Sequence, residues 1–289
     1  MKYHNPIITG FHPDPSVCRV GNDFYLVNSS FEYFPGIPIY HSTDLTHWEQ
    51  IGHVLDRKNQ LKLVSGAPNC LGIYAPTIRY HEGIFYCIVT NVGGRSGGNF
   101  FVYTTDPYGR WSNPVKLPFA GIDPSLFFDE DGRIYYTGTD TGIYITEITF
   151  DVVRNDTPKR NELPVSIQNV KCGEKHYIWN GSGGNNPEGP HLYRIHDMYY
   201  LMIAEGGTEY CHMVTIARSK NVYGSYEACP HNPVLSNRST CLNIKAIGHA
   251  DLVEDSQGSW WAVCLGIRPL GYPFRHNLGR ETMLAPVKW

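Results

Sequence analysis

The sequence is poor in charge and in long apolar runs, and both shortages limit what the protein can bind. Charged residues make up 18% of the 289 residues, and the formal net charge is −3. Without a polybasic stretch, neither nucleic acid nor an anionic membrane is an expected partner. No apolar run reaches transmembrane length, and the first residues lack the apolar core of a secretory signal. We therefore expect a soluble cytoplasmic chain, or a secreted or periplasmic one if a leader has been removed.

Metal-ligand patterns are also missing. The eight cysteines are scattered without a Cys-x-x-Cys pair, and the 13 histidines form no His-Glu-x-x-His motif or other ligand-spaced cluster. Cysteines inside apolar runs, such as Cys87, act as small hydrophobic side chains. The sequence therefore predicts free buried thiols, no catalytic metal and no required cofactor.

Helical periodicity is absent as well, and a repeat takes its place. Five segments share a small or polar pair, a short apolar strand, a turn and then an aromatic pair. Several of these turns, such as residues 129–132, have the chemistry of β-hairpins. The repeats begin at Asp14, Ala75, Asp123, Gly189 and His249.

The repeat predicts the fold class. Five units leave roughly 60 residues each, which suits a four-stranded antiparallel blade with its loops. A β-sandwich would not repeat a whole four-stranded unit. We therefore predict an all-β fold, a five-bladed β-propeller, in a single domain over residues 1–289. Residues 154–162 are polar and contain proline, which indicates a surface loop.

Carboxylates recur at one position of the repeat. The first strand of each blade lines the channel of a propeller, so equivalent positions converge on its axis. Asp14, Asp123 and His249 occupy such positions, and Glu188 directly precedes Gly189 at another. A single aspartate before proline commonly caps a turn. Two of them beside a glutamate favour a functional cluster, because gathered carboxylates raise one another's proton affinity at a cost in stability.

Two opposed carboxyl groups with a third to tune them suit glycoside hydrolysis. One carboxylic acid protonates the leaving oxygen, and one carboxylate activates water or attacks the sugar. A separation of about 6.5–9.5 Å between them gives inversion, and about 5 Å gives retention. The sequence leaves this separation open. The glycine-rich residues 181–184 lack the lysine of a phosphate loop and are expected to form a flexible approach to Glu188.

Further motifs accompany these residues along almost the whole chain. Each is modest alone, and they span residues 5–6, 10–16, 30–36, 122–126, 188–193, 204–208, 248–250 and 278–282. Together and in this order they resemble glycoside hydrolase family 43, in the branch that contains β-xylosidases and α-L-arabinofuranosidases. The resemblance implies a five-bladed propeller and an inverting reaction.

The resemblance also implies a role for each carboxylate. Asp14 would be the general base that deprotonates the attacking water, and Glu188 would be the general acid. Asp123 would keep Glu188 protonated and orient it. Near neutral pH this acid needs a raised pKa.

Four other residues would contact the substrate, and an ordinary alternative stays open for three of them. Arg280 would bind sugar hydroxyls, or else pair with a nearby acid such as Glu281. Phe31 would form a wall for the pentose, or else be a core aromatic. His249 would hold water or a structural calcium ion in the channel, or else be a satisfied core histidine. Tyr74 stands where related sequences usually carry tryptophan, so the platform beyond the cleaved bond should differ in shape.

Longer members of the family continue into a β-sandwich that lends an aromatic side chain to the site. Either the chain is truncated before this sandwich, or the protein lacks it and has a more open site, which would weaken a strict exo preference. The predicted substrate is a small xylo- or arabino-oligosaccharide, which loses β-D-xylose, α-L-arabinofuranose or both. A homo-oligomer is left open.

Three other functions are weighed against this one. A sugar-binding propeller without catalysis is the main alternative, and it would need one carboxylate to be lost or misplaced. A fructan-cleaving relative is disfavoured because its Asn-Asp-Pro-Asn motif is absent. A protein-interaction scaffold would not explain the axial charge.

Overall fold

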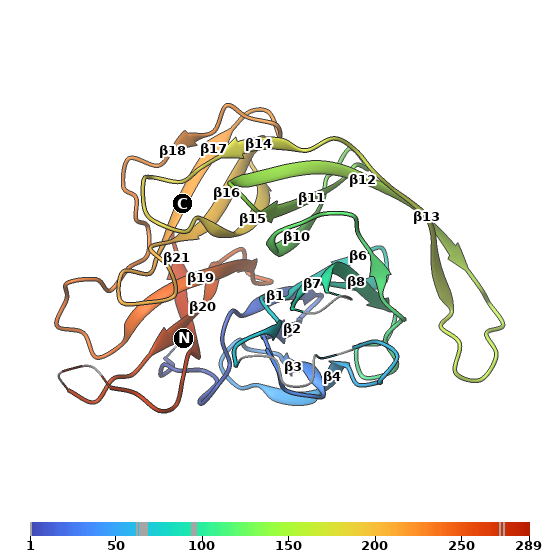
Figure 1. Ribbon diagram of the computed structural model, residues 1–289, viewed down its shortest axis with the longest axis horizontal. Helices are drawn as coiled ribbons and strands as arrows, with labels where there is room; N and C mark the ends of the chain where they lie inside the picture. The colour runs from blue at the N-terminus through green and yellow to red at the C-terminus, as the bar shows by residue number, and fades with distance from the viewer. Residues whose placement is uncertain (1, 62, 64–68, 94–96, 272, 274) are drawn as a thin grey trace.

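The computed structural model describes residues 2–61, 63, 69–93, 97–271, 273 and 275–289. The regular structure of these residues is entirely β, in five antiparallel sheets arranged around a common centre (Figure 1). This arrangement confirms the predicted five-bladed propeller. Among the described residues, no helix has the length and apolar character needed to cross a membrane.

The five sheets follow one another along the chain. Blade 1 contains β1 (Ser16–Val20), β2 (Asp23–Val27), β3 (Gly36–Ser42) and β4 (Glu49–Leu55). Blade 2 contains β5 (Gly72–Ile73), β6 (Thr77–His81), β7 (Ile84–Val92), β8 (Gly98–Thr104) and β9 (Val115–Lys116). Blade 3 contains β10 (Ile122–Phe128), β11 (Ile134–Thr139), β12 (Ile143–Arg154), β13 (Val165–Cys172) and β14 (His176–Trp179). Blade 4 contains β15 (Glu188–Ile195), β16 (Met198–Glu205), β17 (Met213–Ser219) and β18 (Glu227–Ala228). Blade 5 contains β19 (Lys245–Glu254), β20 (Trp260–Ile267) and β21 (Glu281–Val287).

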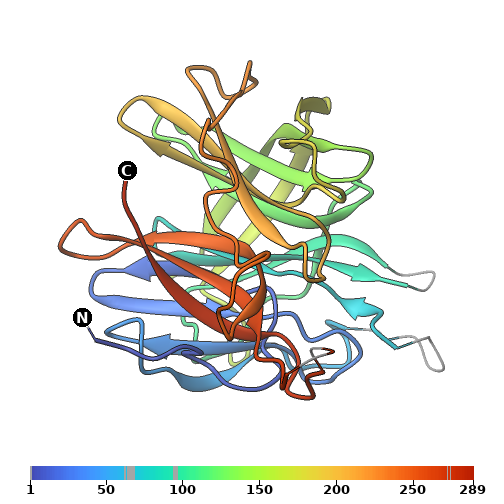
Figure 2. The same cartoon turned by 90° about the vertical axis from the view of Figure 1, so that its left-hand side faces the viewer.

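The N-terminal segment closes the ring at blade 5. Ile8 forms a β-bridge with Thr282, and the backbone N–H of Ile7 donates to the Thr282 carbonyl at 2.9 Å. The side chain of Asn5 exchanges two hydrogen bonds of 2.8 Å with the backbone of Leu284. Both chain ends therefore lie on the same side of the molecule, next to blade 5 (Figure 2). This pairing covers part of the edge of β21, which would otherwise expose unpaired backbone groups.

The apolar core is divided among the interfaces between neighbouring blades. Each blade alternates side chains toward its two neighbours, so every interface receives apolar residues from both sides. Buried pairs across the five interfaces, in blade order, include Val27 with Val89, Tyr86 with Leu126, Ile145 with Leu201, Met202 with Cys264, and Val263 with Leu26. The core is therefore shared between neighbouring blades rather than contained within any one of them.

Two smaller expectations can be compared with this fold. Residues 155–164 connect β12 to β13 at the tip of a long hairpin that leaves the ring, which confirms the predicted surface loop (Figure 1). All eight cysteines are free, as expected, but their burial differs from the prediction. Cys18, Cys87 and Cys264 are buried, whereas others, such as Cys70, lie at the surface because they fall in loops.

Candidate active site

The inner strands are kinked where four of the sequence repeats begin. Asp14, Asp123, Gly189 and His249 all have left-handed backbone, with φ of 51°, 53°, 60° and 45°. In blades 3, 4 and 5, strand pairing shifts register across this position. Such a conformation costs a non-glycine residue about 1–3 kcal/mol and is concentrated at functional sites. Asp14, Asp123 and His249 are nevertheless about 95% buried, with exposed fractions of 5%, 6% and 5%.

Asp14 is held as a carboxylate by its neighbours. Ser29 Oγ donates to Asp14 Oδ2 at 2.5 Å, and Arg280 Nη1 donates to Asp14 Oδ1 at 3.1 Å. His249 Nδ1 lies 3.9 Å from the same Oδ1 atom. Burial raises the pKa of Asp14, but Arg280, His249 and the Ser29 hydrogen bond together outweigh it and lower that pKa below its ordinary value. Asp14 can therefore accept a proton.

Asp123 and Glu188 have the opposite tendency. One oxygen of each lies within 4.8 Å of the other and of a His249 ring nitrogen. Burial raises the pKa of Asp123 well above its ordinary value, and the charges of Glu188 and Asp14 raise it further. Burial and then the Asp14 charge raise the pKa of Glu188 to about 7. The pair therefore retains a proton near neutral pH, and its titration belongs to both residues together.

Arg280 faces the carboxylates. Its Nη1 atom donates to Asp14 and, at 3.1 Å, to Thr208 Oγ1. Pairing with Glu281, the alternative suggested by the sequence, is not observed. Glu281 is fully buried and instead accepts hydrogen bonds of 2.7 and 2.9 Å from Arg268. The guanidinium of Arg280 is thus directed into the site, where its remaining donors can meet hydroxyl groups.

Phe31 and Tyr74 form an aromatic wall next to Arg280. The guanidinium carbon of Arg280 lies 5.2 Å from the centre of the Phe31 ring. That ring also lies 5.4 Å from Tyr74 and 5.8 Å from the half-exposed Phe11. Gly72 permits this arrangement, because a Cβ atom there would lie 2.2 Å from the Phe31 carbonyl oxygen. Phe31 therefore stands at the edge of the site rather than inside a blade interface.

His249 packs against the backbone beside the acid. A Cβ atom on Gly189 would lie 3.0 Å from the His249 ring, so glycine is needed here for space as well as for its positive φ. Burial lowers the pKa of His249, which is therefore neutral near pH 7. A neutral ring can offer one acceptor nitrogen to the site.

His212 also belongs to the site, and no role was predicted for it. Its side chain is fully buried, and its Nε2 atom lies 3.9 Å from Glu188 Oε1. Burial lowers its pKa to about 4, so the ring is neutral. Gly248 makes room for it, because a Cβ atom there would lie 2.5 Å from the imidazole. His212 follows the motif at residues 204–208 by four positions, which was the signal available in the sequence.

Glu205 anchors the segment that leads to Glu188. It is fully buried and accepts hydrogen bonds from the backbone N–H groups of Ser182 and Gly184, and from Thr215 Oγ1. A Cβ atom on Gly181 would lie 1.9 Å from a Glu205 oxygen. The expected flexible approach is therefore tied down, and its glycines let the backbone come close to a carboxylate.

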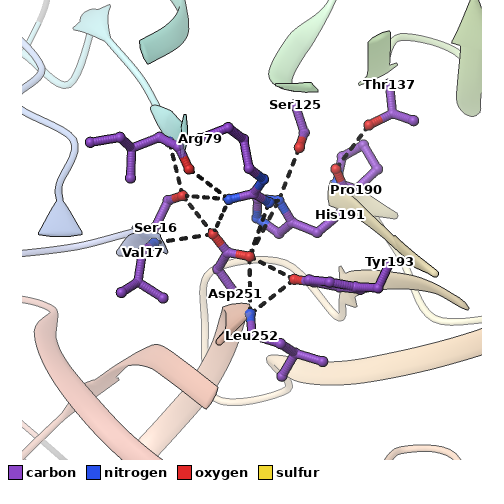
Figure 3. A network of polar contacts seen from close by, with 11 residues as sticks. Ser16, Val17, Arg79, Ser125, Thr137, Pro190, His191, Tyr193, Asp251 and Leu252 are labelled. Atoms are coloured by element: carbon purple, nitrogen blue, oxygen red, sulfur yellow. Dashed lines mark hydrogen bonds and ion pairs between the residues drawn. The ribbon is translucent and has the colours of Figure 1, made fainter. Parts of the chain in front are cut away.

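A second polar layer lies on the same inner strands, two residues beyond the kinks (Figure 3). Asp251 accepts two hydrogen bonds from Arg79, at 2.7 and 3.1 Å. It also accepts 2.6 Å hydrogen bonds from Ser16 and Tyr193. Arg79 donates in addition to His191 Nδ1 at 2.9 Å. These side chains come from blades 1, 2, 4 and 5, and His191 Nδ1 also lies 3.2 Å from Ser125 Oγ in blade 3. The layer therefore joins all four strands next to the kinked residues.

Asp123, Glu188 and His249 can be tested as ligands for the calcium ion predicted near His249. Calcium prefers about six to eight oxygen ligands, whereas these residues supply two carboxylates and one nitrogen. Binding would also require both carboxylates to be ionised, although burial raises the pKa of both. The set suits a shared proton better than calcium, and the calcium ion remains a prediction.

An apolar hollow of about 520 Å³ lies elsewhere, between blades 4 and 5. Val214, Leu252 and Trp289 are among its lining residues. None of the three axial carboxylates contributes to it. The chemistry is therefore concentrated at the kinked ends of the inner strands.

The chain is similar to known glycoside hydrolases along nearly its whole length. Residues 3–289 match the glycosyl hydrolases family 43. A non-reducing end α-L-arabinofuranosidase of Bacteroides ovatus is 50% identical over 99% of this chain and 52% of its own length. A β-xylosidase of Bacillus subtilis is 38% identical over 100% of this chain and 56% of its own length.

Solved structures share the fold. The crystal structure of a xylan β-1,4-xylosidase from Bacillus halodurans superposes with a TM-score of 0.87 at 38% identity, over 100% of this chain and 55% of that one. The chain thus spans about half the length of the curated relatives it matches. A single domain over residues 1–289 without a further β-sandwich remains a prediction.

Proposed function

The chain belongs to glycosyl hydrolase family 43, and from that premise we propose that it releases a terminal pentose from xylo- or arabino-oligosaccharides with inversion. One observation carries the proposal. A buried carboxylate with a lowered pKa, Asp14, shares a site with two carboxyl groups whose pKa values are raised, the buried Asp123 and the partly buried Glu188. Hydrolysis of an acetal needs one proton acceptor and one proton donor at the same time.

The proposed reaction has one chemical step. Asp14 takes a proton from water while the water oxygen bonds to the anomeric carbon. The bond from that carbon to the glycosidic oxygen breaks on the opposite side, and Glu188 gives its proton to the leaving oxygen. Asp14 ends protonated and Glu188 ends ionised, so one proton must return through solvent before the next turnover. Attack from the side opposite the leaving group inverts the configuration.

The other residues position the sugar and tune the acid. Asp123 lies beside Glu188. Its burial favours the protonated form of the pair. Arg280 binds hydroxyls of the pentose, and Phe31 supplies the apolar wall against which its ring packs. Tyr74, next to Phe31, belongs to the platform beyond the cleaved bond. His249 offers its neutral ring to the same pocket.

The two carboxyl pKa directions also set the pH dependence. The acid must stay protonated, so kcat/KM falls as pH rises through the Glu188 pKa of about 7. The base must stay ionised, and its pKa lies below the ordinary value, so activity is retained well into the acid range. A binding-only propeller would show neither limb.

The decisive experiment compares 4-nitrophenyl β-D-xylopyranoside with 4-nitrophenyl α-L-arabinofuranoside, and follows the released sugar by proton NMR. We expect turnover of at least one substrate, with the inverted anomer appearing first. On the trisaccharide of the cleaved pentose, whose leaving sugar needs a proton far more than 4-nitrophenolate does, Glu188→Gln should lose activity. Glu130→Gln, a matched change at a surface residue whose side chain is 80% exposed, should keep it. No turnover of either pentoside by the wild type would reject the enzyme, equal turnover of the trisaccharide by the wild type and Glu188→Gln would reject Glu188 as the acid, and early release of the retained anomer would reject inversion.

A further inference from the structure

A loop over residues 206–212 joins β16 to β17 and ends beside the proposed acid. The Gly206 N–H donates to the Asn185 carbonyl at 2.7 Å, which ties the loop to the segment that enters β15. At the other end, the His212 N–H donates to the Glu209 carbonyl at 3.0 Å and closes a turn. Backbone hydrogen bonds therefore fix the place from which the His212 side chain extends.

The His212 ring is enclosed, yet neither of its nitrogens has a hydrogen-bond partner among the described residues. The residue is 1% exposed. Burial lowers the pKa of the ring, and the nearby Ala246 carbonyl acts to raise it but forms no complete hydrogen bond with either nitrogen. A buried polar group without a partner is costly. Gly248 nevertheless leaves the space that this ring fills, so the fold accommodates hydrogen-bonding atoms that it does not satisfy.

One of these atoms faces the acid. Nε2 of His212 lies 3.9 Å from Glu188 Oε1, which is longer than a hydrogen bond. The Glu188 side chain is 20% exposed, whereas that of His212 is fully buried, so the ring contacts the enclosed part of the acid. Hydrogen bonds between catalytic groups are often long in a free enzyme and shorten when substrate binds. A small rotation of the carboxyl group would bring Oε1 within hydrogen-bond distance of Nε2.

The chemistry of the acid decides the direction of this hydrogen bond. The His212 ring is neutral, so one of its nitrogens carries a hydrogen. Glu188 becomes a carboxylate when it gives its proton to the leaving oxygen, and a carboxylate can only accept hydrogen bonds. A bond from Nε2–H to Oε1 becomes stronger as this charge develops. It therefore stabilises the transition state more than the bound substrate, which is the condition for raising kcat.

We propose that His212 is a positioning residue for the acid: its Nε2–H donates to Glu188 Oε1 and turns Oε2, with its proton, toward the leaving oxygen. This inference rests on the proposed function. His212 acts through Glu188 and does not contact the sugar, because its side chain is fully buried. Its effect must therefore depend on how much the leaving group needs a proton. A departing sugar needs one, whereas 4-nitrophenolate leaves with little help.

The test compares kcat for two substrates of one pentose, the trisaccharide and the 4-nitrophenyl pentoside that the wild type cleaves. His212→Met removes both nitrogens with little change in volume. It should lower the trisaccharide-to-aryl ratio of kcat about tenfold, with KM for the trisaccharide unchanged. His212→Gln has nearly the shape of that variant but carries an amide N–H near the place of Nε2, so it should recover part of the ratio. His231→Met, at an exposed histidine just after β18, is the matched control and should keep the wild-type ratio.

The outcomes separate this inference from the one beneath it. A loss in His212→Met that falls equally on both substrates would show a packing role and overturn the inference, as would an unchanged kcat for both. Either result leaves the proposed function intact, whereas a wild type that cleaves neither substrate would overturn both. If His212→Met fails to fold, as judged by its circular dichroism, His212→Asn replaces it. Its shorter amide does not reach Oε1, so its ratio should fall below that of His212→Gln, and equal ratios would overturn the inference.

Discussion

Two polar layers occupy the same axis, only two residues apart on the inner strands. They differ in how their buried carboxyl groups are balanced by cationic side chains. In the layer of Asp14, Asp123 and Glu188, carboxylates outnumber the single guanidinium of Arg280, and burial raises the pKa of Asp123 and Glu188. In the layer of Asp251, Arg79 pairs with the carboxylate through two hydrogen bonds. Burial acts to raise the pKa of Asp251 too, but Arg79 and its other partners lower it well below the ordinary value.

The difference shows how a propeller can separate stability from chemistry. The layer of Asp251 and Arg79, called here the matched layer, joins blades through satisfied hydrogen bonds. The layer of Asp14, Asp123 and Glu188, called here the unmatched layer, keeps a buried carboxyl group protonated. That protonation is unfavourable for folding at neutral pH but supplies an acid. Because both layers lie on the same strands, the first can hold the second in place.

Removing the proposed base should have the largest effect on the unmatched layer. Asp14→Asn removes the acceptor of the water proton but keeps the shape, so kcat should fall about 10³-fold, within the usual range for a general base. Steady-state kinetics on the active 4-nitrophenyl pentoside would measure it. Asp131→Asn, at an exposed turn, is the control and should behave as wild type. Activity within tenfold of wild type would remove Asp14 from the mechanism.

Breaking the matched layer should instead lower stability. Asp251→Asn leaves the partly buried Arg79 without its counter-charge, and the free energy of unfolding should fall by about 3 kcal/mol. Urea denaturation at pH 7 would measure the change. The double variant Arg79→Met with Asp251→Leu removes both charges and should recover part of the loss. A loss below 1 kcal/mol in the single variant would contradict the stabilising role of this layer.

The two layers should also respond to pH in opposite directions. Asp123 has a raised pKa in the folded state, so it destabilises the fold increasingly as pH rises from about 4 through that pKa. Asp123→Asn should therefore be more stable than wild type at pH 8, with little difference at pH 4. Asp251 has a lowered pKa, so its contribution is complete above about 4 and is lost as pH falls further. Urea denaturation at pH 4 and pH 8 would measure the free energy of unfolding of Asp123→Asn and of the wild type. Equal stability of the two at pH 8 would contradict the raised pKa of Asp123.

A smaller effect is expected at Arg280. Lysine keeps the charge near Asp14 but loses the planar fork that reaches Thr208 and the sugar. Arg280→Lys should raise KM about tenfold with a smaller change in kcat, since a lost substrate contact acts mainly on binding. Arg268→Lys, which alters the neighbouring pair with Glu281, serves as the control for local disturbance. An unchanged KM would show that Arg280 acts on Asp14 alone.

Much of this architecture could be predicted because it repeats. Asp14, Asp123 and His249 begin three repeats, and a propeller must bring equivalent positions of its inner strands to one axis. Glu188 could be placed in the same way because it adjoins a fourth such position. The structure brings all four together, and it also places Arg280 and Phe31 beside them, as the family resemblance implied.

Other residues could not be placed because they lie outside the repeat. Glu205 ends the second strand of blade 4, and His212 lies in the loop before the third strand. Glycines at 181, 184 and 248 leave space for these two side chains. Arg79 meets Asp251 across 172 positions of sequence. A hollow lined by Asp140 and Glu188 depends on a turn of blade 3 meeting a loop before blade 4.

The sequence by itself determined the number of blades, the inner strands and the carboxylates at their ends, because a repeated pattern constrains equivalent residues to equivalent places. Only the tertiary structure decided which carboxyl groups hold a proton and which are ionised. Those states depend on burial and on charges a few ångströms away, and both arise from contacts between blades that no local pattern records.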